Sequence, residues 1–219
     1  MTTELSIIIV NYRVYPYLDA CLQAVSAALT KVNAEIIVVD NDTDKTKQIK
    51  LAHDFPTIQW ICLTQNLGFA KANNLALEKA VGKYILFLNP DTSIPANTLT
   101  DTVQYLSSNP RVGAVGVQML DGKGCFLPES KRDQPSLLGS FFKLTGLATL
   151  FSHAAIFNSY AFGHLNKNQV HSMPVLAGAF IMIPTVLAQK IGGFDESFFM
   201  YGEDIDLSLR ILHQGFENH

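Results

Sequence analysis

Three short polar clusters follow apolar runs of the sequence and could carry chemistry. They are Asn11–Tyr12, Asp40–Asp42 and Asn89–Thr92. If the apolar runs are parallel strands, the clusters share the edge of the sheet at which open α/β proteins bind their ligands. Asn, Asp and Pro are also common turn residues, so a turn is enough to explain each cluster taken alone. Their joint placement on one edge favours a ligand site.

Two well-known phosphate-binding motifs are absent. Asn11–Arg13 follows the first apolar run in place of G-x-G-x-x-G, and the chain contains no G-x-x-x-x-G-K-[ST]. These absences argue against dinucleotide-dependent dehydrogenases and P-loop NTPases. A bound diphosphate would then be held most simply by a divalent cation on a carboxylate. Asp91 is the candidate ligand for Mg²⁺ or Mn²⁺, which prefer hard oxygen donors.

The elements that would position these clusters alternate along the first half of the chain. Five apolar runs predict buried strands: Leu5–Val10, Glu35–Asp40, Ile58–Leu63, Tyr84–Leu88 and Val112–Val117. The segments between them predict helices: Tyr17–Lys31, Thr43–Asp54, Phe69–Val81 and Asn97–Ser108. Nearly continuous apolar strands are typical of parallel sheets covered on both faces. Strand–helix alternation therefore predicts a parallel α/β sheet with right-handed crossovers.

The second half of the chain gives a weaker pattern at first and then three clear elements. Gly122–Gln134 is polar and predicts a loop that could order when a ligand binds. Leu137–Phe162 is apolar but interrupted by polar residues, which suits either a core helix or a surface helix against a membrane or a partner. The three elements are a strand at Ala179–Ile183, a short helix at Thr185–Ile191 and an amphipathic helix at Glu203–Gln214 closed by Gly215.

Composition narrows the class of protein. Of the 219 residues, 48% are hydrophobic and 16% are charged, with a formal net charge of −3, which argues against long disorder and against nucleic-acid binding. The odd number of cysteines, Cys21, Cys62 and Cys125, indicates a reducing compartment, and we expect Cys21 and Cys62 to be buried. No basic leader precedes the first apolar run, and no apolar stretch reaches 18 residues. We therefore expect a cytoplasmic protein.

Five stretches together bring a family into view: Ser6–Tyr12, Ile37–Asp42, Asn66–Asn74, Phe87–Thr92 and Gly192–Arg210. In this order and at these separations they resemble the bacterial family 2 glycosyltransferases, in particular the rhamnosyltransferase-like branch. The resemblance covers Leu5–Leu120 and Val175–Gly215. It implies a GT-A fold, an α/β Rossmann-like and mostly parallel sheet flanked by helices on both faces. Residues 1–219 would form one domain, with a nucleotide-binding half at 1–120 and an acceptor-side half at 121–219.

The resemblance assigns the nucleotide to the first two clusters. Asp40 would accept a hydrogen bond from the N3–H of a pyrimidine, and Asn11 and Tyr12 would line the pocket for base and ribose. Core packing explains Tyr12 almost as well, and a turn also explains Asp40.

The segment Asn66–Asn74 would form the next wall of the donor site. Asn66 and Gly68 would line it, and Lys71 would bring a positive charge near the diphosphate, although an exposed helix face is an equal explanation for a single lysine. Asn73 and Asn74 form helices poorly, so we expect their side chains to bond to a loop or to the ligand.

The resemblance also assigns a metal ligand and a catalytic base. Asn89 and Asp91 stand in the place of the family's D-x-D motif, with Asp91 as the metal ligand; the neutral Asn89 lowers the charge available to a metal. Asp204 would be the catalytic base. On its helix, Asp206 is expected to pair with Arg210 instead.

Four further residues would contact the sugars in this resemblance. They are Gly178, Ala179, Tyr201 and Glu203. Gly178 and Ala179 match small residues near the donor sugar, and Tyr201 belongs to an apolar stretch that resembles the floor beneath the acceptor. Glu203 also suits a first helical turn simply because acidic residues there complement the helix dipole.

The implied reaction is inverting transfer from a UDP- or dTDP-sugar to a glycan or lipid-linked acceptor in bacterial surface polysaccharide synthesis. Relatives usually continue well beyond Gly215, so a truncated C-terminus is expected. This leaves two alternatives: a non-catalytic nucleotide-sugar-binding domain, or a domain that docks on a membrane-bound partner through Leu137–Phe162. A sugar nucleotidyltransferase would need a Gly- and Arg-rich loop after the first strand, which is missing.

Overall fold

The computed structural model describes residues 2–42, 44–127, 130 and 169–219. The apolar segment 137–162 and the last part of the predicted loop 122–134 therefore lie outside the described residues. Within the described part, no helix is long and apolar enough to cross a membrane.

A five-stranded sheet in the order β3-β2-β1-β4-β6 forms the centre of the molecule. Its strands are β1 (Leu5–Asn11), β2 (Ala34–Asp40), β3 (Gln59–Cys62), β4 (Tyr84–Leu88) and β6 (Phe180–Pro184). The first four strands run parallel, and β6 pairs antiparallel with β4. Every residue of β1 and β4 is buried, as their continuous apolar sequences predict. The mostly parallel α/β sheet is therefore confirmed.

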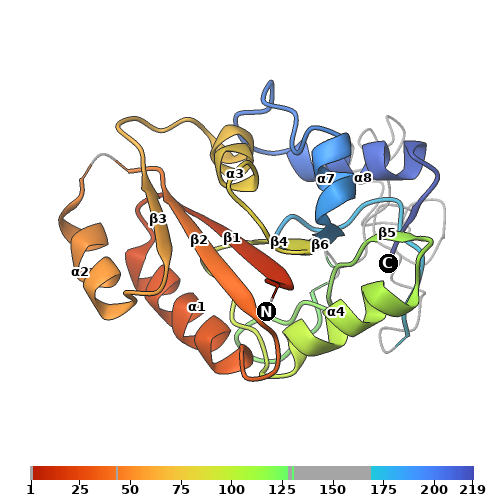
Figure 1. Ribbon diagram of the computed structural model, residues 1–219, viewed down its shortest axis with the longest axis horizontal. Coiled ribbons are helices and arrows are strands. Elements are labelled where there is room, and N and C mark those ends of the chain that lie inside the picture. Colours follow the sequence, from red (N-terminus) through yellow and green to blue (C-terminus); the bar gives the residue numbers. More distant parts are fainter. Residues whose placement is uncertain (1, 43, 128–129, 131–168) are drawn as a thin grey trace, which may run out of the picture.

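Helices cover both faces of this sheet (Figure 1). They are α1 (Tyr15–Ala28), α2 (Thr46–Asp54), α3 (Phe69–Leu77), α4 (Thr98–Ser108), α7 (Thr185–Lys190) and α8 (Glu203–His213). Alternate residues of β1 enter two separate cores: Ile7 and Ile9 pack with residues of α1 and α4, whereas Ile8 and Val10 pack with residues of α3, α7 and α8. This alternation is the period-two geometry of a strand, and it determines which polar side chains reach the site.

The buried strand predicted at Val112–Val117 forms only in part, and the prediction that it joins the central sheet is wrong. Only β5 (Val112–Ala114) forms there, and it pairs with β7 (Glu217–Asn218) in a separate two-stranded sheet. The edge of β4 is taken by β6, which pairs antiparallel with it, so β5 does not pair with β4. Val115 still reaches β6 through an isolated bridge to Met182, which fastens the small sheet to the large one.

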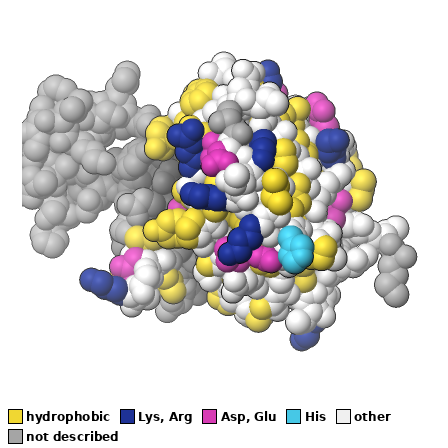
Figure 2. All heavy atoms as spheres, turned by 90° about the vertical axis from the view of Figure 1, so that its left-hand side faces the viewer, with side chains coloured by type: hydrophobic (Ala, Val, Ile, Leu, Met, Phe, Trp, Pro, Cys, Tyr) yellow, Lys and Arg dark blue, Asp and Glu magenta, His cyan; other side chains and the backbone are white. Residues whose placement is uncertain are grey.

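The prediction that Cys21 and Cys62 are both buried is confirmed for Cys21 and wrong for Cys62. Cys21 is buried in α1, but Cys62 is exposed, as is Cys125. Cys62 ends β3, the edge strand of the sheet, so no further strand covers that side. On the face seen in Figure 2, basic and acidic side chains are interspersed and no continuous basic patch forms.

Candidate active site

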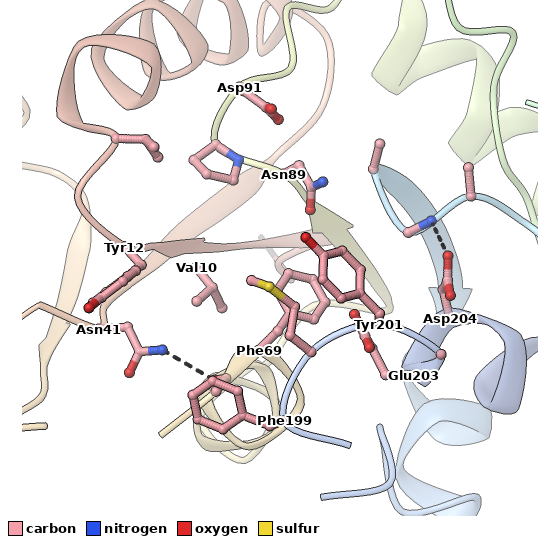
Figure 3. A pocket seen from close by; sticks show the side chains of 18 of the residues that line it. Val10, Tyr12, Asn41, Phe69, Asn89, Asp91, Phe199, Tyr201, Glu203 and Asp204 are labelled. Carbon is pink, nitrogen blue, oxygen red and sulfur yellow. Dashed lines mark hydrogen bonds between the residues drawn. The ribbon is translucent and has the colours of Figure 1, made fainter. Parts of the chain in front are cut away.

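A cavity of about 550 Å³ opens at the carboxyl edge of the parallel strands (Figure 3). Its lining includes the segments that follow β1, β2 and β4, the segment that leads into α3, the segment before β6, and the segment that leads into the first turn of α8. Ligands of open α/β sheets bind at this edge. The predicted site residues in this lining are Tyr12, Asn66, Gly68, Asn89, Asp91, Gly178, Ala179, Tyr201, Glu203 and Asp204.

Three predicted residues do not line the cavity: Asn11, Asp40 and Lys71. Asp40 is fully buried, and its Oδ1 accepts hydrogen bonds from Asn11 Nδ2 at 2.8 Å and from the Tyr15 hydroxyl at 3.1 Å. Burial raises the pKa of Asp40, although both hydrogen bonds oppose the shift. Asn11 and Asp40 therefore lie in the interior on the α1 side of the sheet, and Lys71 is exposed on α3.

Tyr12 forms the wall that follows β1. Its side chain is 40% exposed, and the guanidinium of Arg13 lies 5.1 Å from the centroid of its ring. Arg13 has a left-handed backbone with φ of 62° and donates from Nε to Asp42 Oδ1 at 3.2 Å. A cation beside an aromatic ring is attracted by the ring's quadrupole, so the neighbouring Arg13 side chain stabilises the orientation of the Tyr12 ring.

Asn41 is a lining residue that the sequence reasoning did not assign. Its Nδ2 donates to Asn66 Oδ1 at 2.7 Å and to the carbonyl of Gly68 at 3.2 Å. Its Oδ1 accepts from the backbone N–H of Leu67 at 2.8 Å. Asn41 therefore ties the end of β2 to the segment that leads into α3, and it forms one side of the cavity (Figure 3).

Position 68 requires a glycine because the backbone of Phe199 lies close to it. Its φ is 84°, and a Cβ there would lie 2.6 Å from the carbonyl oxygen of Phe199. The same carbonyl accepts from the backbone N–H of Phe69 at 2.9 Å, so the start of α3 is fixed to the segment before α8. The prediction that Asn73 and Asn74 bond to a loop or to the ligand is confirmed for Asn74, which bonds the loop at Phe194 through both of its polar atoms. It is wrong for Asn73, which donates to the carbonyl of Phe69 at 2.9 Å within the same helix, α3.

Asn89 and Asp91 follow β4 and both face the cavity (Figure 3). The backbone N–H of Asn89 donates to the carbonyl of Ala179 at 3.0 Å, which holds this segment against the one before β6. The exposed carboxylate of Asp91 and the amide oxygen of Asn89 are hard donors that suit Mg²⁺ or Mn²⁺. Within the described ranges, however, no group of three or more His, Cys, Asp or Glu side chains could hold a metal ion unaided.

Asp204 lies on the opposite side of the cavity from Tyr12 (Figure 3). Its Oδ2 accepts from the backbone N–H of Gly178 at 3.1 Å, and its Oδ1 from the N–H of Ile205 at 2.9 Å. The expected pair further along α8 is confirmed, since Arg210 Nε donates to Asp206 Oδ2 at 2.7 Å. Asp204 therefore faces the cavity, whereas Asp206 forms an ion pair with Arg210.

The segment before α8 forms the outer rim. Phe199, Met200 and Tyr201 are 60%, 51% and 82% exposed, and Tyr201 has a left-handed backbone with φ of 70°. Glu203 follows and is only 8% exposed. Burial raises the pKa of Glu203, and the neighbouring carboxylate of Asp204 adds to the effect.

Acidic groups without basic ones are found among the described residues that line the cavity. Asp91, Glu203 and Asp204 contribute carboxyl groups, and no Lys, Arg or His is found among the described residues that line it. A ligand that carries a diphosphate would meet like charges at this surface. A cation, or polar groups from outside the described residues, would be needed to offset them.

Comparisons with known proteins agree on one family. The model of "Glycosyl transferase family 2" matches residues 6–165. The N-acetylglucosaminyl-diphospho-decaprenol L-rhamnosyltransferase of Mycobacterium tuberculosis H37Rv is 26% identical over 237 residues, covering 99% of this chain and 73% of the relative. The rhamnosyltransferase WbbL of Escherichia coli K12 is 28% identical over 224 residues, covering 97% of this chain and 78% of WbbL.

Solved structures share the fold at lower identity. The mannosyltransferase PcManGT from Pyrobaculum calidifontis, in complex with GDP-Man and Mn²⁺, superposes with a TM-score of 0.66 at 20% identity over the whole of this chain. Residues 1–349 of TarS from S. aureus, in complex with UDP, give a TM-score of 0.63 at 21% identity over 95% of this chain. This chain spans 54% and 55% of those two structures, about half of their length.

Proposed function

The chain belongs to glycosyltransferase family 2, and from this premise we propose that it transfers a sugar, with inversion, from a UDP- or dTDP-sugar to a glycan or lipid-linked acceptor. Rhamnosyltransferases are among its relatives, and other relatives act in O-antigen and glycan biosynthesis. The observation that carries the proposal is one cavity that Tyr12, Asp91 and Asp204 all line. An aromatic group for a base, a carboxylate for a cation and a carboxylate for a proton are what such a transfer needs.

The donor would lie across the cavity from the strand ends towards α8. The base would stack on Tyr12 beside Asn41, whose Nδ2 and Oδ1 already bond to the wall formed by Asn66 and Gly68. The diphosphate would then lie towards Asn89 and Asp91. Asn11 and Asp40 would not contact the nucleotide. Their hydrogen bond would hold together the ends of β1 and β2, which carry the residues of the nucleotide pocket. A role for Lys71 stays a prediction, because its side chain is exposed outside the cavity.

Asp91 would hold a divalent cation, which would supply Lewis-acid stabilisation of the leaving nucleoside diphosphate. One feature supports its use: the lining is acidic and has no basic side chain among the described residues. Asp91 and Asn89 would supply too few ligands to bind the cation alone. The oxygens of the diphosphate would complete the coordination, so metal and donor should bind together.

Asp204 would serve as the general base. The acceptor hydroxyl oxygen attacks the anomeric carbon from the face opposite the diphosphate, the bond from that carbon to the diphosphate oxygen breaks, and the hydroxyl proton passes to the Asp204 carboxylate. The hydrogen bond from Gly178 would keep the carboxylate oriented before the proton arrives.

Location and partners follow from the same proposal. The three free cysteines fit a reducing cytoplasmic compartment. Contact with a membrane or a membrane-bound partner would depend on residues 137–162, which lie outside the described part of the chain. It stays a prediction.

A nucleotide panel tests the proposal. The thermal unfolding midpoint is measured with UDP, dTDP, GDP and CMP, each with and without Mn²⁺, and sugar transfer from the preferred donor is then assayed. We expect a stabilising shift with UDP or dTDP that grows with Mn²⁺, followed by transfer with inversion. Binding without transfer would favour the non-catalytic nucleotide-sugar-binding domain. The absence of any nucleotide response would refute both functions.

A further inference from the structure

The first two turns of α8 are bonded to the segment before β6 at matching positions. Oδ2 of Asp204 accepts from the backbone N–H of Gly178 at 3.1 Å, the bond drawn as a dashed line at Asp204 in Figure 3. One helical turn later, Oγ of Ser208 accepts from the N–H of Leu176 at 3.1 Å. The helix and the segment therefore run in opposite directions. A helical turn rises about 5.4 Å, close to the length of two extended residues, so one arrangement of the two segments makes both bonds.

The hydroxyl group of Ser208 makes two hydrogen bonds. Besides accepting from Leu176, it donates to the carbonyl of Asp204 at 2.7 Å, and the residue is only 1% exposed. A serine inside a helix often donates to the carbonyl four residues back, so that bond alone indicates no special role. Ser26 of α1 makes the same bond to Leu22 at 2.7 Å, and it is exposed. Ser208 differs because its oxygen also joins the helix to a second segment.

Asn218 of β7 extends this contact beyond Ser208. It is fully buried, and its Nδ2 donates to the carbonyl of Ser208 at 3.0 Å and to that of Pro174 at 3.4 Å. Its Oδ1 is buried without a hydrogen-bond partner among the described residues, which lowers stability. An apolar side chain would avoid this cost. The bridge that Nδ2 makes between α8 and the segment before β6 therefore explains the asparagine.

We propose that Ser208 and Asn218 are positioning residues for Asp204. They hold the segment 173–178 along α8 so that the N–H of Gly178 meets the Asp204 carboxylate. This inference rests on the proposed transferase function, in which Asp204 is the general base. Neither Ser208 nor Asn218 is among the described residues that line the cavity, so both act through Asp204. A shift of about 1 Å at a reacting group can reduce a rate by roughly 10²-fold, even when its cause lies far from the chemistry.

A double-mutant cycle provides the first test. Ser208→Ala removes the bond to Leu176, and it is made in the wild type and in Asp204→Asn. The donors are dTDP-L-rhamnose and UDP-N-acetylglucosamine, and the acceptor is N-acetylglucosaminyl diphosphate on a short polyprenyl chain. In the wild type we expect kcat to fall about 10-fold, with the Kd of dTDP and UDP unchanged. In Asp204→Asn the residual rate should fall less than about 2-fold, because the proton acceptor is already absent. Ser208→Thr keeps the hydroxyl group and should recover most of the rate.

Amide hydrogen exchange provides a second test, which needs no activity. The exchange rate of the Gly178 N–H is measured by NMR in the protein without ligands. In Ser208→Ala and in Asn218→Ala we expect this amide to exchange about 10-fold faster or more, because its bond to Asp204 opens more often. Ser26→Ala is the matched control, since it removes the same bond to the carbonyl four residues back. It should change neither the exchange of Gly178 nor kcat.

The possible results separate the inference from the proposed function. Faster exchange of Gly178, with a loss of rate that depends on Asp204, supports the inference. Unchanged exchange in both Ser208→Ala and Asn218→Ala overturns it and leaves the proposed function intact. An equal loss of rate with and without Asp204→Asn, or a weakened affinity for dTDP and UDP, shows a general structural role and also overturns it. A wild-type protein that transfers neither sugar overturns the inference together with the proposed function.

Discussion

The backbone N–H of Gly178 donates a hydrogen bond of 3.1 Å to Oδ2 of Asp204. A Cβ at position 178 would lie 3.3 Å from Cβ and 3.4 Å from Oδ2 of Asp204, so the two segments are closely packed at this point. The two residues are 26 positions apart, and β6 and α7 lie between them in sequence. The contact therefore fixes the first turn of α8 against the segment before β6, and it defines the orientation of one carboxylate in the cavity.

Replacing Asp204 by Asn should remove transfer while preserving donor binding. Asn keeps an oxygen that can accept from Gly178, but it cannot take a proton from the acceptor. We expect kcat to fall by roughly 10²- to 10⁴-fold, with the affinity for the nucleoside diphosphate within about 2-fold of the wild type. Asp206→Asn on the same helix is the matched control, because Asp206 pairs with Arg210 at the surface. Equal rates for Asp204→Asn and Asp206→Asn would refute the role of Asp204.

Replacing Asp91 by Ala should uncouple nucleotide binding from the metal. Asp91 is the exposed carboxylate that follows β4 in the cavity, and no group of three or more His, Cys, Asp or Glu side chains in the described residues could hold a metal ion. We expect Mn²⁺ to tighten nucleoside diphosphate binding by the wild type and to have little effect on Asp91→Ala, as measured by calorimetry with Mn²⁺ and with EDTA. Asp101→Ala on the exposed face of α4 should behave as the wild type. A full Mn²⁺ effect in Asp91→Ala would exclude it as the ligand.

The central sheet could be predicted from sequence because its strands are continuous apolar runs. The pairing of β5 could not, since a run such as Val112–Val117 carries no signal for which edge is free. β6 occupies the edge beside β4 as an antiparallel strand, although its sequence at Phe180–Pro184 comes long after β5 in the chain. Which of two strands pairs with the edge of β4 depends on tertiary packing, and the local sequence pattern of a strand does not predict it.

The side chains at the strand ends could have been placed better from the same pattern. Ile36 and Val38 of β2 face the core of α1, so Asp40, two residues further, faces it too. The same period places Asn11 with Ile7 and Ile9. Alternation thus accounts for the buried bond between Asn11 and Asp40, and it points to Asn41 as the residue that turns to the cavity. The contact of Gly178 with Asp204 depends on two distant segments, so no local period could have predicted it.

Replacing Asn74 by Ala should destabilise the loop that leads to the cavity rim. The side chain of Asn74 accepts from the backbone N–H of Phe194 at 2.9 Å and donates to its carbonyl at 2.8 Å. Phe194 also packs edge-on against Phe87 at 4.7 Å between ring centroids. Loss of the two bonds should lower the free energy of unfolding by about 2 kcal/mol, as measured by urea denaturation. Lys71→Ala on the same helix is exposed and should change it little; equal effects of the two would show that the Asn74 bonds contribute nothing.

Replacing Tyr12 by Ala should weaken binding of the nucleotide, whatever sugar it carries. The Tyr12 ring is 40% exposed at the cavity and is accompanied by the Arg13 guanidinium. Stacking of a base on an aromatic ring should account for about 10-fold or more in affinity. Tyr12→Phe keeps the ring and should bind normally, and Tyr17→Ala removes a tyrosine that is exposed on α1 away from the cavity. An unchanged Kd for UDP and dTDP in Tyr12→Ala would place the base elsewhere.

Replacing Asp40 by Asn should change how stability depends on pH. Burial raises the pKa of Asp40 above its ordinary value, although the hydrogen bonds from Asn11 and Tyr15 and the charge of Lys45 oppose the shift. The folded protein therefore keeps this proton at pH values at which the unfolded chain has released it. The resulting stabilisation is complete below the unfolded-state pKa and is lost as the pH rises through the folded-state pKa.

The amide that Asp40→Asn introduces cannot release a proton, so the variant lacks this loss, while the other ionisable groups are shared and cancel in a comparison. We expect the free energy of unfolding of the wild type minus that of Asp40→Asn to fall as the pH rises above the ordinary aspartate pKa, and then to level off. Urea denaturation at a series of pH values measures it. A difference that rises with pH would mean that Lys45, whose Nζ lies 3.9 Å from Asp40 Oδ2, and the two hydrogen bonds outweigh burial. Asp40 would then be held as a carboxylate beneath the nucleotide wall, with a charge that also acts on the donor site.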